Sequence, residues 1–183
     1  PPPMPYIQDR FVHDADAHIM ETPNWLHDHA DPAIRERLNR PQYVNELRQT
    51  GDNEDQLQNL KLAFARIAEK QASAAYRKDE AADIMNRKNF AATGAFIAAD
   101  RPRSLDLIGV ASQLVFNTFH NRRLHDWEHT GDLELAYGAA RAHNRGMLEF
   151  CSVDPRLLAT CYVPLADFER TAAMAKECLD QGA

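Results

Sequence analysis

Acidic residues and histidines alternate with small residues near the start of the chain. The stretch HDADAHIME runs from His13 to Glu21 and places Asp14, Asp16 and His18 at every second position. Residues two apart on a β-strand point to the same face, so a strand here predicts that these three side chains project together. Carboxylate oxygens and imidazole nitrogens are ligands that zinc, manganese and iron all accept, so the spacing predicts a divalent-metal site.

Two interpretations of this stretch stay open on the residues alone. Short polar alternation is also common on exposed strands, where it needs no ligand. If the strand instead lines the interior of a parallel barrel, its carboxylates are costly to bury without a positive charge nearby. In that case Asp16 and His18 are the expected metal ligands, and Asp14 and Glu21 are expected to support them by hydrogen bonding.

The elements that would position these residues alternate between strands and helices. Hydrophobic periodicity predicts strands over 10–19, 112–116 and 157–163. It predicts helices within 24–100, over 104–108 with Gly109 as a C-terminal cap, over 133–153, and from an Asp167 cap to about Gly182. Pro41 and the turn Gly51-Asp52-Asn53 are expected to interrupt the long helical stretch. Strands that alternate with helices pair in parallel, so the fold class is expected to be α/β.

Polar residues follow the second expected strand. His120 lies just past its carboxyl end, where it is a candidate substrate contact, with a solvated loop histidine as the alternative. The next stretch, HNRRLHDWEHTGD, is expected to be a polar loop. Its Arg122 and Arg123 are of the type that binds carboxylates in a two-pronged manner, and His125, Trp127 and His129 share this stretch.

Composition excludes several classes of protein. The 183 residues carry 21 basic and 27 acidic side chains, a formal charge of -6, and these charges are interspersed. A nucleic-acid-binding protein would show a basic patch, which is absent from this pattern. No run approaches the roughly 20 apolar residues of a membrane span, and no basic-then-apolar leader opens the chain, so a cytoplasmic protein is expected. The three cysteines are expected to be reduced core residues.

The stretch DADAHIMETPNWL resembles the opening of the amidohydrolase-related metal-dependent hydrolases. That group also contains aminocarboxymuconate-semialdehyde decarboxylase and the resorcylate-type decarboxylases. Residues 87–119 and 135–183 are similar to later segments of the same family. The resemblance implies a (β/α)8 TIM barrel, of which residues 1–183 form the N-terminal part, with a helical insertion at 24–100 and the remainder expected beyond 183.

The same resemblance implies what the chain does. Asp16 and His18 take the places of the family's His-x-His or Glu-x-His ligand pair, and zinc is the expected ion, with manganese or iron as alternatives. The implied activity is metal-dependent hydrolysis of a small organic substrate, and non-oxidative decarboxylation is the alternative within the family. The remaining metal ligands would come from later strands or from a complementary chain. In the alternative, the chain is an inactive remnant that has no further ligands.

A different class of function is also open. The helices within 24–100 could wrap a partner subunit, so that the chain serves as a non-catalytic half-barrel. A homo-oligomer is expected from the family, where dimers are common. These residues specify neither the substrate nor the general base.

Overall fold

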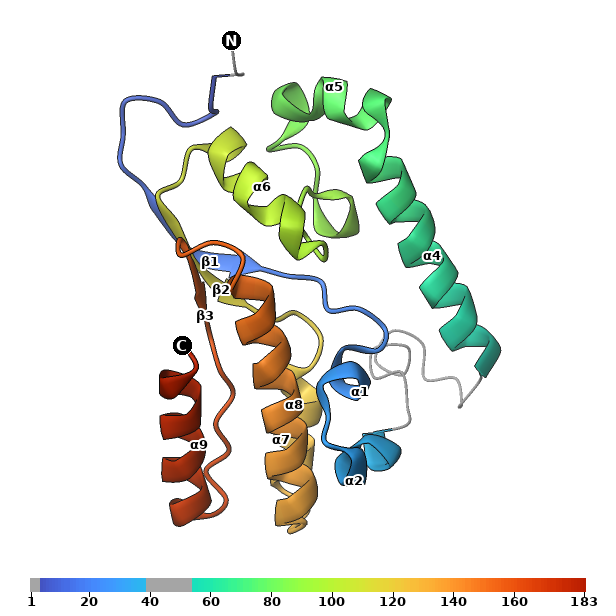
Figure 1. Cartoon of the computed structure of the whole chain (residues 1–183), viewed down its shortest axis with the longest axis vertical. Helices are drawn as coiled ribbons and strands as arrows, with labels where there is room; N and C mark the ends of the chain where they lie inside the picture. The colour runs from blue at the N-terminus through green and yellow to red at the C-terminus, as the bar shows by residue number, and fades with distance from the viewer. Residues whose placement is uncertain (1–3, 39–53) are drawn as a thin grey trace.

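The computed structural model describes residues 4–38 and 54–183, and it is built around a small parallel sheet (Figure 1). Strands β1 (His13–His18), β2 (Ser112–Phe116) and β3 (Leu157–Ala159) lie in the order β1-β2-β3. The expected α/β fold with parallel strands is confirmed, and β2 has the predicted bounds. The third strand is shorter than the predicted 157–163, because strand pairing ends at Ala159 and the chain continues as an irregular segment.

Helices occupy the connections between the strands. In chain order the helical elements are α1 (Trp25–His29), α2 (Pro32–Arg35), the short 3-10 helix η1 (Glu36–Leu38), α4 (Glu54–Ala72), α5 (Ala74–Asp83), η2 (Asn89–Ala91), η3 (Ala98–Asp100), α6 (Arg101–Ile108), α7 (Asn121–Glu128), α8 (Leu133–Cys151) and α9 (Phe168–Asp180). In the view of Figure 1, α5 and α6 lie above the sheet, α4 lies to its right, and α7, α8 and α9 lie below it.

Strand β1 contains one more residue than the matching part of β2. Asp14 pairs with Gln113 and Ala17 pairs with Val115, so three steps along β1 match two steps along β2. An extra residue of this kind is a β-bulge, which reverses the alternation of side chains beyond it. Asp14 and Ala17 therefore lie on the same face of the sheet although they are three residues apart.

The bulge separates Asp14 from the other two predicted site residues. His18 pairs with Phe116, which lies on the opposite face from Gln113, and the Asp16 side chain lies beside His18. The prediction that Asp14, Asp16 and His18 share one face is thus wrong for Asp14 by strand pairing, although all three residues line one cavity. Its physical reason is the strand pairing, which the alternation of residues along one strand does not reveal.

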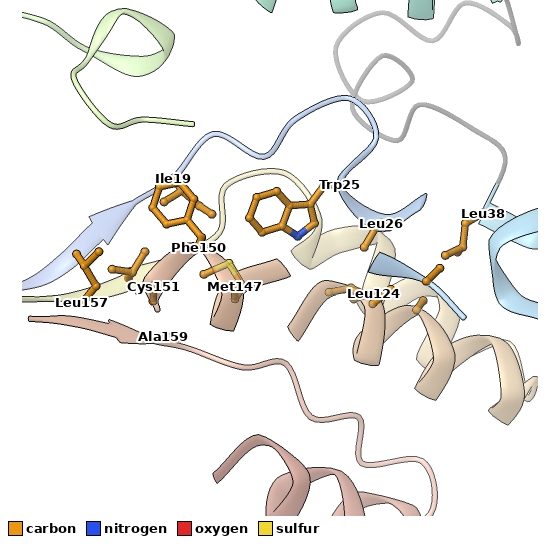
Figure 2. Packing of buried hydrophobic residues seen from close by; sticks show 14 of the residues in the cluster. Ile19, Trp25, Leu26, Leu38, Leu124, Met147, Phe150, Cys151, Leu157 and Ala159 are labelled. Carbon is orange, nitrogen blue, oxygen red and sulfur yellow. The ribbon is translucent and has the colours of Figure 1, made fainter. Parts of the chain in front are cut away.

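The main core lies where α1 and α2 pack against α8. Figure 2 shows Trp25 of α1 beside Met147 and Phe150 of α8, with Ile19 from the end of β1 close by. Two glycines of α8 allow this close approach. A Cβ atom on Gly146 would lie 2.5 Å from the Trp25 ring, and one on Gly138 would lie 2.5 Å from Ile34. The segment that follows β1 is thereby fixed to the longest helix below the sheet.

The stretch HNRRLHDWEHTGD contains a helix, so the prediction of a polar loop there is wrong. Residues 121–128 form α7, which packs against α8. Leu124 is buried and Trp127 packs against the main core, and this (i, i+3) pair holds the helix in place. Two apolar residues are too few to give a recognisable stripe in the sequence, although they suffice once α8 is present.

The two predicted caps, Gly109 and Asp167, are confirmed, and Asp132 is a further cap that was not predicted. Gly109 ends α6 in the left-handed conformation with φ of 88°. Asp132 accepts a hydrogen bond from the backbone N–H of Leu135 at the start of α8, and Asp167 does the same for Arg170 at the start of α9.

Helices α4 and α5 pack on their own chain. Phe64 of α4 meets Phe90 and Phe96 edge-on, with ring centroids 5.0 and 4.9 Å apart. Glu80 of α5 is buried, forms an ion pair with Arg103 of α6, and accepts a hydrogen bond from Thr93. The predicted helical character of 24–100 is confirmed for these elements. Pro41 and the predicted turn at 51–53 lie outside the described residues.

Two further expectations concern the burial of the cysteines and the presence of membrane-spanning helices. Cys151 and Cys178 are buried, Cys161 is half-buried, and all three are free thiols. Within residues 4–38 and 54–183, none of the helices combines the length and the apolar character that a membrane span requires.

Candidate metal centre

Asp16 and His18 meet at the carboxyl end of β1. Nε2 of His18 lies 3.3 Å from Oδ1 of Asp16, and the two side chains are 43% and 88% exposed. The carboxyl ends of parallel strands are where α/β proteins bind their ligands. The two predicted ligands are therefore adjacent, accessible and at the expected edge of the sheet.

The protonation of the His18 ring follows from its other nitrogen. Nδ1 lies 2.8 Å from the backbone carbonyl oxygen of Asn117, which can only accept, so Nδ1 carries the proton. In the neutral ring Nε2 then presents a lone pair toward a carboxylate oxygen. Two acceptors at 3.3 Å need a proton or a cation between them.

The donor set fits a divalent metal. Bonds of about 2.0–2.2 Å from zinc to an imidazole nitrogen and a carboxylate oxygen imply a separation of about 3.3 Å between those atoms in a tetrahedral site. The observed separation of Nε2 and Oδ1 is 3.3 Å. Among the described residues, however, the groups of three or more clustered metal-ligating side chains do not include Asp16 and His18. The pair supplies two ligands and leaves the others to be found.

Asp14 supports the carboxyl end of β1 through a buried chain of hydrogen bonds. Its Oδ2 accepts from Nε2 of Gln113 at 3.0 Å, and Oε1 of Gln113 accepts from Nε of Arg101 at 2.9 Å. Arg101 also donates to the carbonyl oxygens of His18 and Gly94, at 3.3 and 3.2 Å. Oδ1 of Asp14 also accepts a hydrogen bond from the backbone N–H of Asp16 at 3.1 Å. Asp14 thus acts on both Asp16 and His18 through the backbone.

Glu21 holds the loop that orients His18. Its buried carboxylate accepts hydrogen bonds from the backbone N–H groups of Thr118, Phe119 and His120, at 3.0, 3.0 and 3.3 Å for the shortest contact of each. These residues directly follow Asn117, whose carbonyl accepts from His18. Thr118 Oγ1 also donates to the carbonyl of Ile19 at 2.6 Å, which fixes this loop to β1 a second time.

The charges around Glu21 keep its carboxyl ionised. Burial alone would raise its pKa, but the neighbouring His120 and His143 side chains lower it from 4.5 to about 2. Burial lowers the pKa of His143 from 6.5 to about 3, helped by repulsion from His120, so this imidazole is neutral at pH 7. Glu21 therefore retains the full negative charge that its three backbone donors require.

His120 is buried and does not lie on the rim of the site. It is 2% exposed, with Nδ1 3.2 Å from Oε1 of Glu21, and its ring packs edge-on against His143 at 5.9 Å between centroids. The expected position at a substrate-facing edge is thus wrong. The cause is Glu21, whose buried carboxylate accepts hydrogen bonds from the backbone of residues 118–120 and so places His120 in the interior.

Two cavities lie on the side of the helical insertion. One, of about 330 Å³, is lined by the three predicted site residues of β1, Asp14, Asp16 and His18. Arg87, Lys88 and Arg101 also line it. A second, of about 770 Å³, lies against α4 and α5 and includes none of the predicted site residues. The cavity beside the ligand pair therefore carries both acidic and basic side chains.

Sequence reasoning missed three groups that shape this site. Arg101 and Gln113 are buried polar residues that join Asp14 to the backbone of His18, and the Asn117 carbonyl sets the His18 tautomer. A buried arginine carries no sequence signal beyond its place at the start of α6, and a backbone carbonyl carries none. His143 of α8 is also one wall of the Glu21 cluster, because its ring packs against His120.

Comparison with known proteins adds no assignment. No protein-family model matches the chain, and no curated protein matches it either.

Proposed function

We propose that the chain contributes Asp16 and His18 to the metal centre of a metal-dependent hydrolase of the amidohydrolase type. The observation that carries the proposal is the 3.3 Å approach of His18 Nε2 to Oδ1 of Asp16, with Nδ1 of the same ring 2.8 Å from the carbonyl oxygen of Asn117. A zinc, manganese or iron ion held there would supply Lewis-acid activation of water or of a substrate oxygen.

The remaining ligands belong to the same proposal. Catalytic zinc sites commonly use three protein ligands, and this pair provides two. A (β/α)8 barrel would bring further ligands to the same edge from later strands. On the face of the sheet that carries His18, Phe116 is half-buried and Leu158 is 50% exposed. Both side chains are what additional strands of a barrel would cover, so this face supports a sheet that is larger in the complete protein.

The residues of this chain have distinct tasks in the proposed reaction. Asp16 and His18 bind the ion, and the ion's charge offsets the exposed carboxylate. Asn117 keeps the His18 proton on Nδ1, and Glu21 keeps Asn117 in place. A general base would come from outside the described residues, and a small organic substrate would occupy the cavity beside the pair.

One observation favours the second candidate, non-oxidative decarboxylation. Arg87 and Lys88 line the cavity that contains Asp16 and His18. Cationic side chains beside a metal site favour a substrate that carries a carboxylate, which is the group a decarboxylase removes. Release of carbon dioxide rather than consumption of water would identify this reaction.

The proposal is tested by metal analysis of the complete protein. Asp16→Ala and His18→Ala are each expected to lose bound metal and activity together. His13→Ala is the matched control, because His13 lies on the same strand, is exposed, and contacts Ser112 at the opposite end. Full metal content and activity in both site variants would overturn the proposal.

The oligomeric and domain predictions stay open in the same way. A single partial domain over 1–183 and a homo-oligomer or complementary chain remain predictions, which mass measurement of the complete protein would test. Deletion within the helical insertion would change the oligomer mass if that segment binds a partner. An unchanged mass would leave its packing on the sheet as its role.

A further inference from the structure

Three metal-binding side chains lie together at the end of α7, far along the chain from β1. His125 and His129 are four residues apart, and their ring centroids lie 4.2 Å apart. Residues four apart on a helix share one face, so the helix brings these rings together. With Glu128 between them, each side chain offers one ligand atom, and these atoms all lie within 4.8 Å of one another.

The side chains are prepared to bind a cation. Nδ1 of His129 donates to the backbone carbonyl of His125 at 2.8 Å, so Nε2 of His129 carries the free lone pair in the neutral ring. The Glu128 carboxylate accepts from Tyr162 Oη and from the Leu165 N–H, both at 2.6 Å. Burial alone would raise the pKa of Glu128, but these two hydrogen bonds hold it below its ordinary value.

The position of the cluster also favours a positive ion. Helix α7 ends at Glu128, and the carboxyl end of a helix carries a partial negative charge. His125 and His129 are exposed, and the shallow cavity beside them is lined by Tyr162, Val163 and Leu165 from the segment after β3. An ion in solution can therefore reach the imidazole nitrogens without any rearrangement of the core.

We propose that His125, Glu128 and His129 form a second binding site for a divalent transition-metal ion of the zinc class, separate from Asp16 and His18. Two imidazoles and one carboxylate are a zinc ligand set. The H-x-x-E-H spacing on a helix is also used by one class of zinc peptidase. Here both Glu128 oxygens are bonded to the segment after β3, so we assign the site a structural role, in which the ion fastens α7 to residues 162–165.

Zinc titration of the full chain tests this inference independently of the proposed function. The starting protein carries Asp16→Ala and His18→Ala, has no purification tag, and is titrated with zinc chloride while calorimetry and histidine NMR signals are recorded. We expect binding of one zinc ion per chain, with changes in the His125 and His129 ring signals and a rise in the unfolding temperature.

Substitution then identifies the ligands. His125→Ala with His129→Ala is expected to abolish the binding, and His129→Gln alone is expected to weaken it at least tenfold. His27→Ala is the control, because His27 is an exposed histidine of α1 outside both clusters. Since all these positions are exposed, circular dichroism should show an unchanged fold. Binding that survives the double substitution, or zinc that shifts neither ring, would overturn the inference.

Discussion

Two carboxylate–imidazole pairs lie near the end of β1, and they differ in almost everything except their chemistry. Asp16 and His18 approach to 3.3 Å at the surface, whereas Glu21 and His120 approach to 3.2 Å in the interior. The Glu21 carboxylate accepts hydrogen bonds from three backbone N–H groups and lies beside the His120 ring. Asp16 lies 88% exposed beside an imidazole lone pair. The buried pair holds structure, and the exposed pair has room for a ligand.

This difference sets opposite expectations for stability and for binding. Removing one member of a buried ion pair leaves the other without a partner, which costs several kcal/mol. Exposed pairs contribute about 0–1 kcal/mol. Substitutions in the buried pair should therefore change folding first, while substitutions in the exposed pair should change metal binding and leave the fold intact.

The largest effect is expected from Glu21→Ala. It leaves three backbone N–H groups without their acceptor and should lower the free energy of unfolding by about 3–5 kcal/mol. Asp16→Ala is the comparison and should change it by less than about 1 kcal/mol in the absence of metal. Urea denaturation of both variants measures the contrast, and equal losses would contradict the division between the pairs.

Acid should destabilise the buried cluster over a defined range. The pKa of Glu21 is lowered from 4.5 to about 2, so its stabilisation is complete above pH 4.5 and is lost as the pH falls toward 2. That difference corresponds to about 3 kcal/mol. The pKa of His143 is lowered from 6.5 to about 3, so below pH 6.5 this histidine binds a proton in the unfolded chain but not in the folded chain. The free energy of unfolding therefore also falls as the pH drops below 6.5.

The His143→Leu variant isolates one part of this pH dependence. It removes the titration of a buried imidazole, so its unfolding free energy should fall less between pH 6.5 and 4.5 than that of the unsubstituted protein. His13→Leu, at an exposed position, should leave the slope unchanged. Denaturation at several pH values provides the measurement, and identical slopes for both variants would show that His143 is not held neutral.

A smaller effect is expected from metal on the exposed pair. In a His125→Ala, His129→Ala background, which removes the binding at the α7 cluster, zinc at 100 times its dissociation constant should stabilise the protein by about 2.7 kcal/mol. His18→Ala added to this background should remove that gain. Thermal unfolding with and without zinc gives the result, and an undiminished gain would place the ion elsewhere.

The smallest effect is expected from Asp14→Ala. It removes two hydrogen bonds, which Asp14 accepts from Nε2 of Gln113 and from the backbone N–H of Asp16, and should cost about 1–2 kcal/mol of stability. Because Asp14 contacts Asp16 at its backbone N–H and reaches His18 through Gln113 and Arg101, it acts on both ligands through the backbone, and zinc affinity at the exposed pair should fall by about tenfold or less. A loss as large as that of His18→Ala in a zinc titration would instead make Asp14 a direct ligand.

The sequence predicted local features better than it predicted the directions of side chains. Strand β2 and the caps at Gly109 and Asp167 depend on neighbouring residues, so their patterns were sufficient. The bulge in β1 depends on pairing with β2, a strand about a hundred residues away. Alternation along β1 alone could not place Asp14 on the opposite face.

The site shows the same limit. The proximity of Asp16 and His18 follows from their spacing, whereas the burial of His120 depends on Glu21 accepting backbone hydrogen bonds from across the fold. Helix α7 was missed because its two anchoring residues need α8 to pack against. Its histidine pair could have been found from the H-x-x-E-H spacing once a helix was assumed.

Metal binding at β1 depends most directly on the protonation and ligation of His18. Nitrogen-15 NMR of the imidazole, recorded with and without zinc on the His125→Ala, His129→Ala background, tests it in one experiment. We predict a proton on Nδ1 before zinc, and a large shift of Nε2 alone when zinc is added, which Asp16→Ala abolishes. A proton on Nε2, or a ring whose nitrogens ignore zinc, would contradict the assignment of Asp16 and His18 as metal ligands.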